Sequence, residues 1–89
     1  MNSKGRIEKS VHTREYATCL RLLRESREKA EITQVQMAQK IGLTQSLYSK
    51  IERGERRLDI IELRTILKHL GISLNRFVDS LESELNRRR

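Results

Sequence analysis

The amino-acid sequence predicts an all-α fold in which five short helices form a compact domain around one small core. Three observations support this prediction: apolar side chains recur at helical spacing in five successive segments, residues that cap helix N-termini precede these segments, and glycines end three of them. The composition agrees, because 36% of the residues are hydrophobic, 3% are aromatic and none is proline, which disfavours a β-sandwich. A length of 89 residues leaves room for one domain.

The charge of the chain indicates an anionic partner. Against 12 Asp and Glu residues stand 19 Lys and Arg residues, which gives a formal net charge of +7. This excess favours nucleic acid or an anionic membrane surface. No apolar run approaches the roughly 18 residues of a membrane span, and the first residues contain no hydrophobic signal region, so we expect a cytoplasmic protein. The single cysteine, Cys19, permits no intramolecular disulfide and is predicted to fill the core.

The first helix is predicted to follow a polar segment. Residues 1–12 are polar and basic and are expected to form a flexible arm, and Thr13 is the expected N-cap of the helix after it. This helix has an apolar stripe at i, i+4, i+7 spacing, with Cys19 on its flank. The stripe consists of Tyr16, Leu20, Leu23, Arg27 and Ala30. One member of the stripe, Arg27, is charged.

The next two helices are predicted to form a helix-turn-helix. Thr33 and Gln36 have the spacing of a capping box, in which each side chain accepts from the backbone N–H of the other residue. The apolar surface of this helix is supplied by Val35, Met37, Ala38 and Ile41. Gly42 ends it, Thr44 caps the following helix, and Gly54 closes that one. Because the interval from Gly42 to Thr44 is too short for a reversal of the chain, the two helices must cross steeply.

Two further helices complete the predicted domain, which spans residues 13–86. Asp59 and Glu62 make a second capping box and open a helix that ends at Gly71. Its apolar residues are Ile60, Ile61, Leu63, Ile66, Leu67 and Leu70. Ser73 caps a last helix over residues 74–86, and a basic tail over residues 87–89 follows it.

The residues from about Leu20 to Leu81 resemble the DNA-binding domain of the Cro/C1-type (XRE) helix-turn-helix family. The matching segments are ITQVQMAQKIGLTQSLYSKIERG, residues 32–54, and LDIIELRTILKHLGISL, residues 58–74. Ala38, Gly42, the IERG ending and the LGIS junction all fall in register. This resemblance implies a lambda-repressor-like fold and sequence-specific binding of double-stranded DNA.

The third helix is predicted to carry the base-reading residues, because a helix in the major groove presents its first turn, and the residues one turn further on, to base edges. The resemblance implies that this set is Thr44, Gln45, Ser46 and Lys50. Gln45 can pair with adenine, Lys50 can donate to guanine, Ser46 can donate or accept, and the Thr44 methyl can meet a thymine methyl. Without the surrounding motif, the same residues would be interpreted as a solvated helix face.

Other residues are predicted to hold the DNA backbone or the fold. The phosphate-binding set is Thr33 and Gln34, at the free amides that begin the second helix, together with Arg53, Arg56 and Arg57. The resemblance implies the three arginines, which would otherwise be interpreted as ordinary surface residues, and it adds that Gln34 supports Gln45. The resemblance also implies a structural salt bridge between Arg27 and Glu52. Leu47 and Tyr48 look exchanged relative to the family pattern, so we expect Tyr48 in the core with its hydroxyl at the edge and Leu47 near the DNA surface.

The last helix extends its apolar stripe through Val78, Leu81 and Leu85, which predicts a dimer interface. We therefore expect a homodimeric regulator, a repressor, on a palindromic operator. Alternatives are an antitoxin that also binds a toxin protein, a restriction-modification controller protein, and non-specific nucleic-acid or membrane-surface binding. We expect no enzymatic activity, metal or cofactor, because His12 and His69 have no predictable acidic or thiol partner and no zinc-type spacing or glycine-rich loop occurs.

Overall fold

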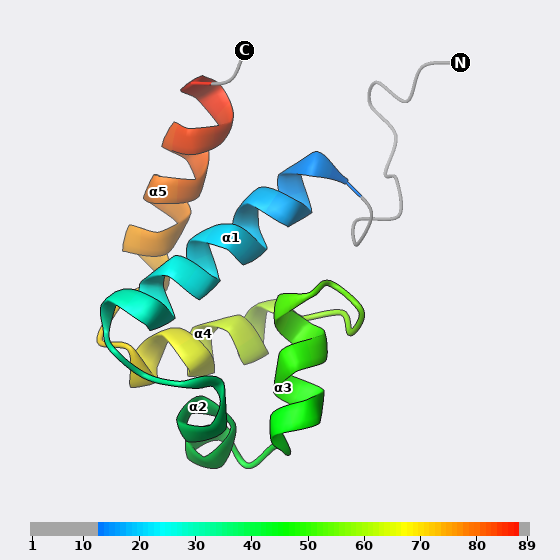
Figure 1. Cartoon of the computed structure of the whole chain (residues 1–89). Coiled ribbons are helices and arrows are strands. Elements are labelled where there is room, and N and C mark those ends of the chain that lie inside the picture. Colours follow the sequence, from blue (N-terminus) through cyan, green and yellow to red (C-terminus); the bar gives the residue numbers. More distant parts are fainter. Residues whose placement is uncertain (1–12, 88–89) are drawn as a thin grey trace.

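The computed structural model describes residues 13–87 and consists there of five α-helices (Figure 1). The helices are α1 (Arg14–Lys29), α2 (Gln34–Ile41), α3 (Gln45–Glu52), α4 (Ile60–His69) and α5 (Leu74–Arg87). The predicted all-α, five-helix fold is confirmed. Arg87 belongs to α5, whereas the predicted arm over residues 1–12 and the end of the basic tail, residues 88–89, lie outside the described residues.

Side chains cap the helices at the positions that the sequence predicts. The Thr13, Thr44 and Ser73 hydroxyls accept from the backbone N–H three residues ahead at 3.0, 3.1 and 3.1 Å. Both capping boxes form, at Thr33 with Gln36 and at Asp59 with Glu62. These bonds satisfy amides that have no carbonyl partner within their own helix, so each helix start is fixed by a local sequence signal.

Left-handed residues end four of the helices. At the end of α3, Gly54 has φ of 79°, the Glu55 N–H donates to the Lys50 carbonyl at 2.8 Å, and the Gly54 N–H donates to the Ile51 carbonyl at 3.0 Å. These two bonds are the Schellman arrangement, which the ends of α2 and α4 also show. At the end of α1 the left-handed residue is Glu31, with φ of 60°, although it carries a side chain.

The end of α1 departs from the prediction that Ala30 lies on the buried stripe. The helix stops at Lys29, and Ala30 is its exposed C-cap. The chain leaves the helical path there because Glu31 turns into the left-handed conformation, which lets the Ile32 N–H donate to the Arg27 carbonyl at 3.2 Å. The four preceding members of the stripe lie at least partly buried.

One core joins all five helices. Its fully buried residues are Leu23, Met37, Ala38, Tyr48, Ile51, Ile66, Leu67 and Phe77. Cys19 is partly buried and packs against this core, as the sequence predicts. The core holds α2 against α3 and α4, and it holds α1 against α3 and α5.

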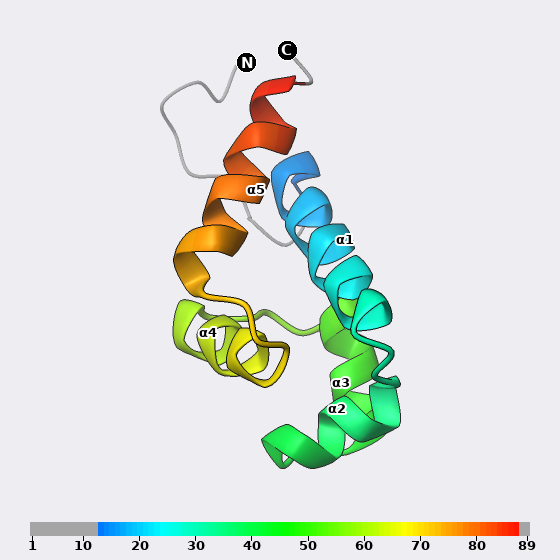
Figure 2. The ribbon, with the colours of Figure 1, turned by 90° about the vertical axis from the view of Figure 1, so that its left-hand side faces the viewer.

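The helix-turn-helix lies at one end of the molecule. Figure 1 shows α2 nearly end-on beside α3, which is seen from the side, so the two helices cross steeply as predicted. In both views α5 extends away from the α2–α3 unit along α1 (Figure 2). Helix α3 therefore lies near one end of the molecule, and α5 extends toward the other end.

The left-handed Glu31 yields a prediction about stability. An L-residue in this conformation costs about 1–2 kcal/mol, whereas glycine adopts it without the steric penalty. We expect Glu31→Gly to raise the free energy of unfolding by about 1 kcal/mol, part of the relief being offset by the greater freedom of glycine in the unfolded chain. Urea denaturation measures this change. Glu31→Ala is the matched control, because it removes the same charge and leaves the strained conformation, and an equal gain from both variants would contradict the explanation.

Candidate nucleic-acid interface

Helix α3 has one buried face and one exposed face. Tyr48, Ile51 and Glu52 point into the protein and are buried. The four predicted base-reading residues, Thr44, Gln45, Ser46 and Lys50, are all exposed. The Thr44 hydroxyl is already used as the N-cap of α3, which leaves its methyl group for a further contact. The first turn of α3 is thus held by the core on one side and open to an external partner on the other.

A chain of hydrogen bonds connects the interior of the protein to Gln45. Arg27 donates to the Glu52 carboxylate, from Nε to Oε2 at 2.6 Å and from Nη2 to Oε1 at 3.1 Å. The Gln34 Nε2 donates to Glu52 Oε1 at 2.9 Å, and the Gln45 Nε2 donates to Gln34 Oε1 at 2.9 Å. The chain therefore runs from α1 through α3 and α2 and ends on the exposed side of α3.

The acceptor-only carboxylate at the start of this chain fixes the orientation of both glutamine amides. An ionised carboxylate cannot donate, so Gln34 must turn its NH₂ group toward Glu52 and its oxygen toward Gln45. Gln45 must then donate to that oxygen with one of its own N–H groups. Its carbonyl oxygen and its second N–H are left for an external partner, and this pair of groups is the one that adenine recognition requires.

The Arg27–Glu52 pair is buried, with side-chain exposures of 8% and 3%. Burial alone would raise the pKa of the Glu52 carboxyl, but hydrogen bonds from Arg27 and Gln34 and the charge of Arg27 outweigh it, so the pKa of Glu52 lies below its ordinary value. Arg27 also donates from Nη1 to the Ile32 carbonyl at 2.7 Å. The guanidinium thus fixes the α1–α2 connection as well as α3.

Tyr48 lies deeper than the sequence suggests. The expectation that its hydroxyl lies at the edge of the core is wrong, because the whole residue is buried and the hydroxyl has no hydrogen-bond partner within the described part of the chain. Burial, together with the neighbouring Glu52, raises the pKa of Tyr48 well above its usual range. The reason is the position of residue 48 on the inward face of α3, next to Glu52 rather than at the rim.

The predicted phosphate-binding residues at the start of α2 are exposed or partly exposed. The capping box uses the amides of Thr33 and Gln36. The N–H groups of Gln34 and Val35, which belong to the first two residues of the helix, have no carbonyl partner in the helix and lie at the positive end of its dipole. An anion could be bound at this position through backbone amides rather than side chains.

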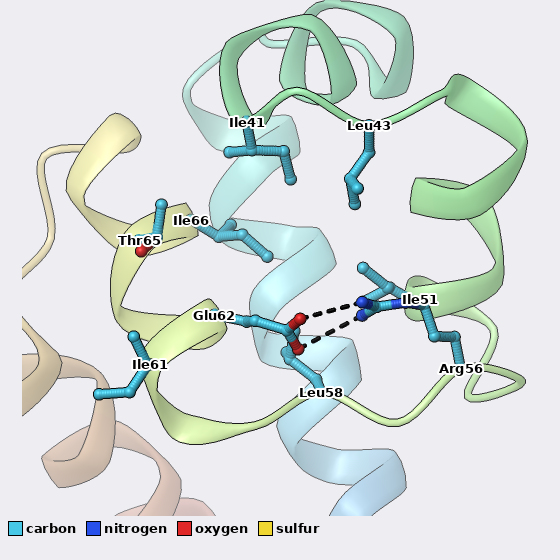
Figure 3. Close-up of a pocket in the computed structure, with 9 residues that line it drawn as sticks. All are labelled: Ile41, Leu43, Ile51, Arg56, Leu58, Ile61, Glu62, Thr65 and Ile66. Carbon is cyan, nitrogen blue, oxygen red and sulfur yellow. Dashed lines mark hydrogen bonds and ion pairs between the residues drawn. The ribbon is translucent and has the colours of Figure 1, made fainter.

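Arg53 and Arg56, which are predicted to bind phosphate, form ion pairs with acidic residues of the same chain. Arg53 donates to both Glu55 oxygens at 3.0 Å. Arg56 donates to both Glu62 oxygens, at 3.3 and 2.9 Å, and Figure 3 shows this pair in the wall of a pocket of about 150 Å³ lined mainly by isoleucine and leucine. Arg57 is exposed. The signal for these partners was present in the sequence, as Glu55 within RGERR and as Glu62 of the capping box.

Several apolar residues that the sequence analysis assigned to helix interfaces are instead exposed. Val35 is 51% exposed. Leu47, which was expected at the surface near the DNA and not in a helix interface, is 39% exposed. Ile60 and Ile61, the first two residues of α4, are 61% and 67% exposed. Periodicity alone did not distinguish these residues from the buried Ile66 and Leu67.

The predicted dimer residues on α5 differ in exposure. Val78 is 38% exposed, whereas Leu81 and Leu85 are partly buried. The contact between α1 and α5 accounts for part of this burial, and Arg21 of α1 donates to Glu84 of α5 at 2.8 Å.

Among residues 13–87, none of the helices combines the length and apolarity that crossing a bilayer requires.

Helices α2 and α3 thus place this protein in the helix-turn-helix class, with one face of α3 exposed. A family model described as helix-turn-helix matches residues 23–77. The chain is 34% identical over 58 residues to the control protein C.MunI of a Mycoplasma species, across 65% of this chain and 78% of that protein. It is also similar to the solved structure of an XRE-family like protein from Pseudomonas syringae pv. tomato str. DC3000, with 38% identity, a TM-score of 0.77 and coverage of 85% of this chain and 93% of the other. The chain belongs to the Cro/C1-type (XRE) helix-turn-helix family and is a DNA-binding transcriptional regulator.

Loss of the buried ion pair should unfold the protein more easily. Arg27→Ala leaves the Glu52 carboxylate buried without its partner, so we expect the free energy of unfolding to fall by about 3–5 kcal/mol. Chemical denaturation followed by circular dichroism measures this loss. Arg53→Ala removes an arginine from an exposed pair and should leave the denaturation midpoint nearly unchanged. A midpoint that is equally unaffected in both variants would show that the buried pair has no structural role.

Proposed function

We propose that this protein is a sequence-specific regulator that binds double-stranded DNA as a homodimer, with α3 in the major groove of each half-site. The observation that carries the proposal is the position of Gln45. Its amide is exposed at the start of α3, and Gln34 and Glu52 fix its orientation from behind. A solvated surface glutamine would not need two buried or partly buried partners in series.

The proposed base-reading chemistry follows from this geometry. The Gln45 carbonyl oxygen can accept from adenine N6, and its second N–H can donate to N7. Lys50 lies about one turn further along α3 and is also exposed, so it can donate to guanine, and Ser46 and the Thr44 methyl complete the reading face. The amides at the start of α2 and the arginines after α3 would hold the flanking phosphates.

The dimer is proposed to form through α5. Val78 remains 38% exposed and is aligned with the partly buried Leu81 and Leu85 on one side of that helix. A twofold pair would place two reading helices about 34 Å apart, which matches half-sites about 10 base pairs apart on a palindromic operator. Occupancy of such an operator at a promoter would block polymerase, so repression is the proposed outcome.

A second candidate is a controller protein of a restriction-modification system. The similarity to C.MunI supports it, because that relative is named a control protein. The DNA-binding chemistry would be the same in both candidates. They differ in the genes that the operator controls, so the position of the operator in the genome separates them.

Selection of bound sequences from a random duplex pool tests the proposal most directly. At moderate ionic strength we expect enrichment of two inverted half-sites whose centres lie about 10 base pairs apart. Light scattering of the free protein should give twice the mass of one 10.5 kDa chain. A pool without an enriched motif would refute sequence-specific reading, and a monomer that selects a single half-site would refute the dimer.

Substitutions on α3 should separate base reading from charge attraction. We expect Gln45→Ala and Lys50→Ala each to cost about 1–3 kcal/mol of binding to the selected site and little on random DNA. Arg57→Ala is the contrasting variant, because loss of a phosphate contact should weaken binding to both DNAs and reduce the salt slope by about 1. Equal losses on both DNAs for Gln45→Ala, measured by titration, would remove Gln45 from the reading set.

A further inference from the structure

The position of Glu55 is unexpected for a residue next to a DNA-binding surface. The left-handed Gly54 and the bond from the Glu55 N–H to the Lys50 carbonyl fold the chain back against the end of α3. The Glu55 carboxylate consequently lies beside Arg53. Its pKa is lowered mainly by the hydrogen bond from Arg53 and by the charge of that residue, with a smaller contribution from Lys50, so it is ionised at neutral pH. A negative charge therefore lies among cations that are proposed to meet DNA.

The contacts of Arg53 occupy the Nε–Nη2 edge of its guanidinium, one of the edges through which it could bind a phosphate with two N–H bonds. Its Nε and Nη2 groups both donate to Glu55 at 3.0 Å, and its Nη1 donates to the Ser49 hydroxyl at 2.6 Å. A carboxylate and a phosphate bind the same edge of a guanidinium through two parallel N–H bonds. Arg53 cannot offer that edge to both acceptors at once.

The neighbouring ion pair between Arg56 and Glu62 differs from the Arg53–Glu55 pair, because its carboxylate has a second hydrogen-bond donor. The Glu62 Oε1 also accepts from the Asp59 N–H at 3.1 Å as part of the capping box, so this carboxylate is fixed to the start of α4. The hydrogen bonds of the Glu55 carboxylate come from Arg53. Both members of the Arg53–Glu55 pair are about half exposed, at 52% and 55%. An exposed pair of this kind is weak enough to exchange its partner.

We propose that Glu55 occupies Arg53 in the free protein as an internal substitute for a DNA phosphate, and that DNA must displace it. This inference rests on the proposed function, specifically on Arg53 as a phosphate-binding residue. Displacement leaves the Glu55 carboxylate next to the DNA backbone, where it repels phosphate and takes up a cation. Glu55 therefore lowers the affinity for every DNA sequence and sets the protein concentration at which the operator is filled.

The test is a comparison of Glu55→Gln with the wild type on the selected operator and on random duplex DNA. We expect Glu55→Gln to bind both DNAs about two- to fivefold more tightly at low salt. The plot of log affinity against log salt should become steeper by up to about 1, because Arg53 then releases a counterion without a compensating cation uptake. The melting temperature should remain unchanged, because Glu55 is exposed and its pair is weak.

Two controls make the test specific. Glu25→Gln removes the same charge from another exposed pair, with Arg21 on α1, and should change DNA affinity less. In an Arg53→Gln background, Glu55→Gln should lose most of its effect, because no guanidinium remains for which the carboxylate and the phosphate compete. Equal effects of Glu25→Gln and Glu55→Gln, or an undiminished effect in that background, would refute the competition. A wild-type protein that binds no DNA would instead refute the proposed function.

Discussion

The buried ion pair between Arg27 and Glu52 is the interaction on which the rest of the structure depends. It connects the end of α1 to the end of α3, and the third bond of Arg27 fixes the carbonyl of Ile32 before α2 begins. Three segments are therefore positioned by one guanidinium. A buried pair contributes little net stability compared with well-packed apolar residues, because both charges must be desolvated. The pair instead selects one arrangement of the helices. An arrangement that separated Arg27 from Glu52 would leave a buried charge without a partner, which is strongly unfavourable.

The same ion pair also orients side chains at the protein surface through a series of hydrogen bonds. Because Glu52 can only accept, it fixes the direction of the Gln34 amide, and Gln34 fixes that of Gln45. An exposed glutamine on an isolated helix would rotate freely and would present oxygen or NH₂ to a base edge with similar ease. In this fold the rotation is restricted before any partner arrives, which reduces the entropy that binding must overcome. The proposed reading face is thus preorganised by a charge that lies beneath it.

The local features of the fold could be predicted from the sequence, because a cap or a capping box involves residues only three positions apart. The capping boxes of Thr33 with Gln36 and of Asp59 with Glu62 are local features of this type. The left-handed glycines that end α2 and α3 are also marked locally, by the residue type itself. Features that depend on distant segments could not be predicted in the same way. The exposure of Ile60 and Ile61 depends on where α4 lies against the core, and the depth of Tyr48 depends on the tilt of α3. The left-handed conformation of Glu31 belongs to a turn that the sequence does not mark with glycine. A charge count cannot identify the acidic partners of Arg53 and Arg56, because it treats each arginine as available to an external anion.

Net charge is consequently a poor measure of how strongly this surface attracts DNA. The formal charge of +7 already subtracts Glu55 and Glu62, but it does not show that these two acidic residues lie beside Arg53 and Arg56. Counterion release depends on which cations exchange a mobile ion for a phosphate, and a cation already paired with a carboxylate releases none until that pair breaks. Pairs that are easily broken reduce non-specific attraction in the free protein without preventing contact once base edges are engaged. If Glu55 competes with phosphate as proposed, the position of acidic residues around α3 affects operator occupancy in addition to the number of basic residues.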